Sequence, residues 1–173
     1  IIKNAPTKKR SAFKILNKIS HHRETFFGTP FEVINIPNPN NTAYTADALR
    51  NHTDLPYFEY APGYQFLHCL MNDAIGGNSS VADGFAVANY LKEKEKGIFK
   101  TLTSTYVKFK DTDYTQKATR VLHSPLITLT KDNDLNDVRF SMAAMGTVDI
   151  DSSKMKKFYE AYHLFAELLH SNK

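Results

Sequence analysis

The order of helical and strand patterns along the chain constrains its fold more than any other feature of the sequence. Apolar residues recur at helical spacing in four segments, which are residues 11–27, 84–94, 97–104 and 152–170. Strand patterns occupy residues 31–36, 64–71 and 105–111, and residues 126–143 hold two more around an Asp/Asn-rich turn. Because the two kinds of segment do not alternate as in a βαβ fold, the sequence predicts an α+β fold with a mainly antiparallel sheet.

Side chains that can cap a helix mark where two of the helices begin. Asp83 precedes the second helical segment, and Ser152 or Ser153 stands at the start of the fourth. A short side-chain oxygen at such a position accepts a hydrogen bond from a backbone N–H of the first turn that otherwise has no partner. The 64–71 run, YQFLHCLM, is almost continuously apolar, so we expect a buried strand there.

Length, charge and cysteine content exclude several classes of protein. At 173 residues the chain has the length of one domain, and no apolar run approaches the ~20 residues of a membrane-spanning helix. The net charge of +4 lies mostly at residues 8–10 and 91–100, which lack the interleaved pattern of aromatic and basic residues, so no nucleic-acid surface is predicted. The single cysteine, Cys69, excludes an internal disulfide and a Cys-rich zinc site, and it fits a reducing compartment.

The stretch RNHTDLPY, residues 50–57, holds the pattern most suggestive of chemistry. If it is extended, His52 and Asp54 point to the same side and can converge on one cation. One imidazole and one carboxylate are two of the three ligands of the facial triad that holds Fe(II) in many oxygenases. The alternative is a turn closed by a side-chain hydrogen bond. A zinc hydrolase would need a further His or carboxylate at metal-ligand spacing, and the sequence offers none.

Four motifs in register resemble one known family. They are NTAY at 41–44, HTDLPY at 52–57, PGYQFLHCL at 62–70 and GGNSSVADGF at 76–85. In this order and spacing the chain, from about residue 26 to its last helix, is similar to the γ-butyrobetaine hydroxylase and trimethyllysine hydroxylase family of carnitine biosynthesis. The resemblance implies a double-stranded β-helix (jelly-roll) core with flanking helices. It also implies bound Fe(II) and 2-oxoglutarate as co-substrate, and it allows for ascorbate.

The resemblance further implies binding roles for eight residues, and it assigns a catalytic role to none. His52 and Asp54 match the first two iron ligands. Six residues match positions that line the co-substrate or substrate pocket: Leu67 and Ser79 beside 2-oxoglutarate, Asn41 and Tyr44 in the substrate pocket, and Phe27 and Phe31 in an aromatic cage. Ring faces attract a trimethylammonium group, which cannot donate a conventional hydrogen bond. The alternative for the two phenylalanines is ordinary core packing.

The chain also departs from the family pattern. The third ligand histidine and the arginine that pairs with 2-oxoglutarate are expected beyond Lys173, and none of His68, His123, His163 and His170 lies in a matching motif. Ala143 and Ala144 stand where the family has paired asparagines that help to read the substrate. The Cys-rich zinc-binding N-terminal domain is not among these residues. We therefore interpret residues 1–173 as a single, partial catalytic domain.

The expected function is that of a dioxygenase that hydroxylates a small, cationic substrate with a trimethylammonium group. The competing hypothesis is a non-catalytic jelly-roll relative that keeps the fold and has lost turnover. With two ligands, residues 1–173 are expected to bind iron weakly and to be inactive by themselves. We expect no nucleic-acid partner, allow for a homodimer, and predict a mitochondrial location with the cytosol as the alternative. The basic, hydroxyl-bearing residues 3–11 fit a position after a transit peptide.

Overall fold

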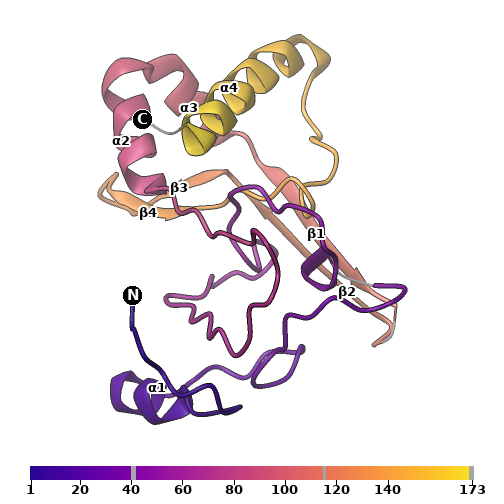
Figure 1. Ribbon diagram of the computed structural model, residues 1–173. Helices are drawn as coiled ribbons and strands as arrows, with labels where there is room; N and C mark the ends of the chain where they lie inside the picture. The colour runs from indigo at the N-terminus through magenta and orange to yellow at the C-terminus, as the bar shows by residue number, and fades with distance from the viewer. Residues whose placement is uncertain (40–41, 115, 172–173) are drawn as a thin grey trace. The chain divides into compact units, whose positions relative to one another are not determined.

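The computed structural model describes residues 1–39, 42–114 and 116–171. Its helices are α1 (Phe13–Ile19), α2 (Gly84–Lys94), α3 (Lys96–Ser104), α4 (Ser152–His170) and the short 3-10 helix η1 (Thr42–Tyr44). Its strands are β1 (Val107–Asp113), β2 (Ala118–Ser124), β3 (Ile127–Leu129) and β4 (Leu135–Val138) (Figure 1). The chain divides into two compact units, residues 1–49 with 64–78 and residues 50–63 with 79–173.

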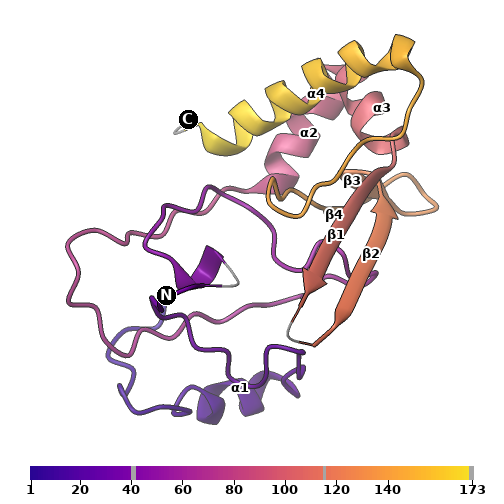
Figure 2. The same ribbon diagram turned by 90° about the vertical axis from the view of Figure 1, so that its right-hand side faces the viewer.

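The second unit contains the main hydrophobic core. Helix α3 contacts α2, α4 and β3, and α2 contacts β4, so the three helices and the β3–β4 pair surround one apolar interior (Figure 2). The largest fully buried side chains are Phe109, Phe158, Phe165, Leu91, Leu102, Leu126, Ile127 and Val107. The helical spacing of Phe158, Tyr162, Phe165 and Leu169 places one face of α4 in this core, as the sequence predicts.

The strands form two antiparallel pairs. β1 pairs with β2 from Val107 opposite Ser124 to Asp113 opposite Ala118, and β3 pairs with β4 with a register shift at Thr128 and Leu129. These pairs confirm the α+β prediction and the hairpin predicted within residues 126–143. They do not form a double-stranded β-helix within the described residues, so the jelly-roll core stays a prediction, as does the single domain.

The structure confirms one predicted cap and corrects the other. The Asp83 carboxylate accepts a hydrogen bond from the Ala86 amide at 2.9 Å, and α2 spans the predicted residues. Helix α4, however, is capped by Asp151, whose carboxylate accepts from the Ser153 amide at 2.8 Å and from the Ser153 hydroxyl at 2.6 Å. Asp151 has an extended ψ of 135° and can reach back to the first turn, whereas Ser152 already lies inside the helix.

Three predicted elements in the first unit are shorter or absent. Helix α1 ends at Ile19 instead of residue 27, because the backbone of Ser20 is extended. Residues 31–36 and 64–71 are not strands, and Leu67 and Met71 are 74% and 79% exposed. A strand requires a neighbour to pair with its backbone groups, and an apolar run reports hydrophobicity but not the presence of that neighbour. The sequence reading also missed β2.

None of the described helices combines the length and the apolar character that crossing a membrane requires.

Candidate functional site

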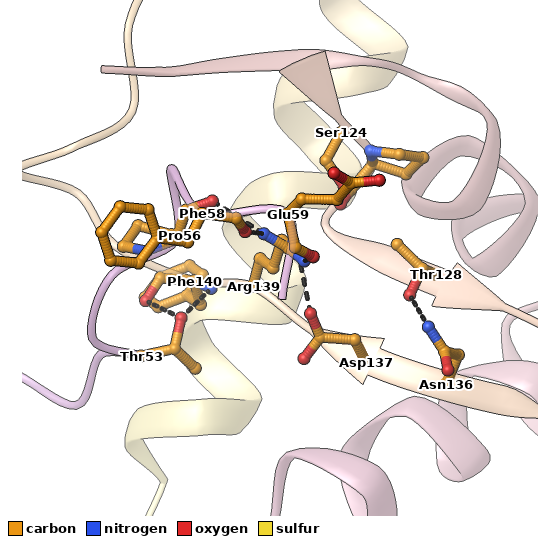
Figure 3. A network of polar contacts seen from close by, with 11 residues as sticks. Thr53, Pro56, Phe58, Glu59, Ser124, Thr128, Asn136, Asp137, Arg139 and Phe140 are labelled. Carbon is orange, nitrogen blue, oxygen red and sulfur yellow. Dashed lines mark hydrogen bonds and ion pairs between the residues drawn. The ribbon is translucent and has the colours of Figure 1, made fainter. Parts of the chain in front are cut away.

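Alternate residues of the 50–54 segment fasten it to the core of the second unit. The Asn51 side-chain amide donates to the Leu169 carbonyl at the end of α4 over 2.8 Å and accepts from the Ser80 hydroxyl over 2.8 Å. The Thr53 amide donates to the Phe140 carbonyl over 2.7 Å, and the Phe140 amide donates back to the Thr53 hydroxyl over 2.9 Å (Figure 3). His52 lies between these two anchors and is exposed.

His52 and Asp54 point the same way, as an extended segment requires. Nε2 of His52 lies 3.2 Å from Oδ1 of Asp54, and the two side chains are 35% and 42% exposed. The other ring nitrogen, Nδ1, lies 2.7 Å from the Arg50 carbonyl, to which it donates. A second hydrogen bond of this kind is what orients a metal-binding imidazole and leaves Nε2 for the metal. The structure thus brings together the two side chains that the sequence pairs.

Two of the groups in this stretch have shifted pKa values. The hydrogen bond to Asp54 raises the pKa of His52 above its ordinary value, partial burial opposes that shift, and the Arg50 carbonyl adds to it. Burial raises the pKa of the Tyr57 phenol, and the negative charge of Asp111 raises it further. His52 therefore carries a proton more readily than a free imidazole, and a metal ion would have to displace that proton.

The donor set suits a divalent metal but is incomplete. An imidazole nitrogen and a carboxylate oxygen are the ligand types that non-haem iron takes. Across residues 1–39, 42–114 and 116–171, no three His, Cys, Asp or Glu side chains lie close enough together to hold a metal ion. His170 is one histidine that does not join the pair. Its Nδ1 lies 2.6 Å from the Ala166 carbonyl, and its ring packs edge-on against Phe140. The pair offers two donor groups, and their role as metal ligands stays a prediction.

The first unit brings together the predicted aromatic residues. The ring centroids of Phe27 and Phe31 are 4.9 Å apart, and those of Phe31 and Tyr44 are 5.4 Å apart. Phe26, to which the sequence reading gave no role, extends the row with its centroid 4.1 Å from that of Phe27. All four rings are half-buried. These distances are typical of aromatic packing, and a role of the rings in an aromatic cage stays a prediction.

The remaining predicted pocket residues differ in how they are placed. Leu67 is 74% exposed, and its place beside 2-oxoglutarate stays a prediction. Its run is not paired as a strand, which is why no neighbouring side chains cover it. Ser79 is exposed, and the hydroxyl of the next residue, Ser80, is the one that bonds to Asn51. Asn41 lies outside the described residues.

Arg139 is a residue of this region that the sequence reading overlooked. It follows β4, is only 5% exposed, and its guanidinium donates to the carbonyls of Pro56, Phe58 and Glu59 (Figure 3). Its Nε also lies 2.9 Å from the Asp137 carboxylate. The sequence does hold one signal for this role, since Arg139 stands at an inward position of a strand pattern. An arginine buried there requires several acceptors around it.

A family and several curated relatives match this chain. Residues 7–173 match the family described as "Taurine catabolism dioxygenase TauD, TfdA family". The chain is 35% identical over 163 residues to the γ-butyrobetaine dioxygenase of Pseudomonas sp. (strain AK-1), a match that covers 94% of this chain and 42% of that protein. It is 34% identical over 150 residues to the human γ-butyrobetaine dioxygenase, covering 85% and 38% of the two chains.

A second group of relatives carries the other name that the motifs suggest. The mitochondrial trimethyllysine dioxygenase of Bos taurus is 33% identical over 107 residues, which is 62% of this chain and 25% of that protein. The chain spans about two fifths of the length of the γ-butyrobetaine dioxygenases that it matches. The family match confirms the resemblance that the four motifs predict. The chain belongs to the TauD/TfdA dioxygenase family.

Proposed function

We propose that this chain is the part of an Fe(II)- and 2-oxoglutarate-dependent dioxygenase that supplies two iron ligands, and that the enzyme hydroxylates a small substrate carrying a trimethylammonium group. The observation that carries the proposal is the His52–Asp54 pair, with 3.2 Å between Nε2 and Oδ1, in a chain of this family. The names of the relatives, γ-butyrobetaine and trimethyllysine dioxygenases, support this substrate class.

Each residue of the pair has a distinct part in holding the metal. His52 would bind iron through Nε2, because Nδ1 is engaged by the Arg50 carbonyl, and Asp54 would bind through its carboxylate. Bound Fe(II), with 2-oxoglutarate and oxygen, supplies the oxidising power that hydroxylation of a C–H bond needs. Asn51 and Thr53 hold the backbone on either side of His52, which fixes the direction in which the imidazole points.

The substrate part of the proposal rests on the aromatic residues of the first unit. Phe27, Phe31 and Tyr44 lie ring against ring, and such a group suits a cation that attracts ring faces but donates no hydrogen bond. We assign Asn41 to the same substrate pocket. Leu67 and Ser79 are assigned to the neighbourhood of 2-oxoglutarate, with ascorbate as a supporting reductant.

Anaerobic titration with Fe(II) tests the ligand assignment. We expect His52→Ala and Asp54→Ala each to weaken iron binding at least tenfold, because each removes one of two donors. His163→Ala is the matched control, since His163 is an exposed histidine on α4 that packs beside Tyr159 and Tyr162. Equal iron affinity in the wild type and in both ligand variants would remove the assignment.

The second candidate function, a non-catalytic relative, is favoured by one observation. Only two metal-binding side chains converge within the part of the chain that the structure describes. The two functions differ in turnover, which is measured as succinate formed from 2-oxoglutarate in the presence of iron and oxygen. Extra succinate on addition of a trimethylammonium substrate supports the enzyme. Iron binding without any extra succinate supports the non-catalytic relative.

Location and assembly complete the proposal. We assign the protein to mitochondria, since the bovine and human trimethyllysine dioxygenases are named as mitochondrial. The cytosol is the alternative, and microscopy of a tagged protein decides between them. A homodimer is proposed as the assembly, which light scattering of the purified protein tests.

A further inference from the structure

Arg139 makes an unusual set of contacts for a residue that no motif singles out. Nη1 donates to the Pro56 carbonyl over 2.9 Å and to the Phe58 carbonyl, and Nη2 donates to the Glu59 carbonyl over 2.8 Å. Figure 3 shows the guanidinium lying between these carbonyls and the Asp137 carboxylate. One buried cation therefore satisfies three backbone acceptors of a short segment.

Residues 56–59 lie outside the regular elements of the fold. They form a turn, in which the Phe58 amide donates to the Leu55 carbonyl over 3.0 Å, and they belong to no helix or strand. The planar guanidinium reaches the three carbonyls with donors in fixed directions, and a lysine ammonium does not reproduce that fork. The Asp137 carboxylate, 2.9 Å from Nε, offsets the cost of burying the charge.

The segment that Arg139 holds is continuous with the candidate metal ligands. Phe140, the next residue, exchanges hydrogen bonds with Thr53 through its amide and its carbonyl. Asp54 is thus bracketed by Thr53 on one side and by the Arg139-bound Pro56 on the other. The Phe140 ring packs against Tyr162 and Phe165 of α4, with centroids 5.6 and 5.8 Å away, so the bracket is itself fixed to the core.

We propose that Arg139 is a positioning residue of the metal site, which holds residues 56–59 against the end of β4 and so keeps the Asp54 carboxylate beside His52. The inference rests on the proposed function, in which His52 and Asp54 hold the metal. It assigns Arg139 no contact with metal or substrate. Its role is to limit the motion of the backbone that carries one of the ligands.

Amide hydrogen exchange of the metal-free chain, followed by NMR, tests the positioning role without any metal. The reporters are the Thr53 and Phe58 amides, whose acceptors are the Phe140 and Leu55 carbonyls. In Arg139→Gln we expect both to exchange about tenfold faster or more, because the segment loses charge-assisted hydrogen bonds and opens locally. The amides of Phe165 and Leu169, in the buried face of α4, should keep their wild-type rates.

The choice of variants separates positioning from general stability. Lys92→Gln is the matched control, because Lys92 also donates to a backbone carbonyl, that of Asn133 at 3.2 Å, away from the segment. Arg139→Lys keeps the charge but not the fork, and Asp137→Asn keeps the fork but removes the charge that compensates it, so both should loosen the segment less than Arg139→Gln. If Arg139→Gln does not fold, these two milder variants carry the test.

Iron affinity supplies the second readout. Loss of a group that orients a metal ligand typically costs about 10–100-fold in metal affinity. We expect such a loss in Arg139→Gln and no loss in Lys92→Gln. If the wild type binds no Fe(II), the proposed function fails, whereas the exchange rates still decide whether Arg139 holds the segment. Faster exchange of Thr53 and Phe58 with wild-type iron affinity overturns the inference, and so do unchanged exchange rates.

Discussion

Thr53 and Phe140, 87 positions apart in the chain, bind each other through both of their backbones and the threonine hydroxyl. The Thr53 amide donates to the Phe140 carbonyl over 2.7 Å, and the Phe140 amide donates to the Thr53 hydroxyl over 2.9 Å. Thr53, which lies between the two candidate ligands, is therefore one of the residues that fasten them to the core. This relationship explains why His52 and Asp54 are exposed side by side although their segment is not a strand.

The first prediction concerns that hydroxyl. Thr53→Val keeps the shape of the side chain but leaves the Phe140 amide, in a residue only 2% exposed, without its acceptor. A buried donor that loses its partner costs ~1–3 kcal/mol, and we expect the free energy of unfolding in urea to fall by that amount. Thr53→Ser keeps the hydroxyl and should lose less. A Thr53→Val protein as stable as the wild type would show that this hydrogen bond contributes nothing.

The second prediction concerns the core face of α4. Phe165 is fully buried and packs edge-on against Phe140 at 5.8 Å between centroids. Replacing a buried phenylalanine by alanine costs ~3–5 kcal/mol, so Phe165→Ala should leave the chain unfolded or close to it, as circular dichroism during thermal unfolding would show. Tyr159→Ala on the same helix is the control, because Tyr159 is 40% exposed and should cost far less. Equal losses in the two variants would contradict the placement of α4.

The third prediction concerns pH and the cap of α4. Hydrogen bonds from the Ser153 hydroxyl and amide lower the pKa of Asp151 below its ordinary value of 3.8. Because the unfolded state then binds the proton more tightly, the Asp151 contribution to stability is present above about pH 3.8 and is lost as the pH falls through the lower folded pKa. Asp151→Asn cannot titrate. The difference in the free energy of unfolding between wild type and variant, measured in urea, should shrink as the pH falls through this range. A difference that stays constant would show that the cap is absent.

Particular residues show what a sequence can and cannot predict. Helix α2 and its Asp83 cap were predicted because local hydrogen bonds and helical spacing decide them. The His52–Asp54 pairing was also predicted, since side chains two apart on an extended segment share a side. The strand predicted at residues 64–71 is absent, because a strand depends on a partner elsewhere in the chain. Arg139 was missed for the same reason: its acceptors lie about 80 residues away.

The fourth prediction separates the two interpretations of the aromatic residues. If Phe31 lines a cage, tetramethylammonium should shift the NMR signals of Phe27, Phe31 and Tyr44, and Phe31→Leu should weaken that binding because a leucine has no ring face. If the rings are only packing, Phe31→Leu should alter stability alone. Sodium chloride at equal concentration is the control for ionic strength. No saturable shift in the wild-type chain would favour packing.

The most direct test of the central claim is addition of Mn²⁺ to the ¹⁵N-labelled chain, because the paramagnetic ion broadens amide signals near it even when it binds weakly. The account predicts that the amides of residues 51–55 broaden first, and that His52→Ala and Asp54→Ala each abolish this selectivity while His163→Ala does not. Broadening that starts elsewhere, or that persists unchanged in both ligand variants, would contradict the assignment of His52 and Asp54 as the metal-binding pair.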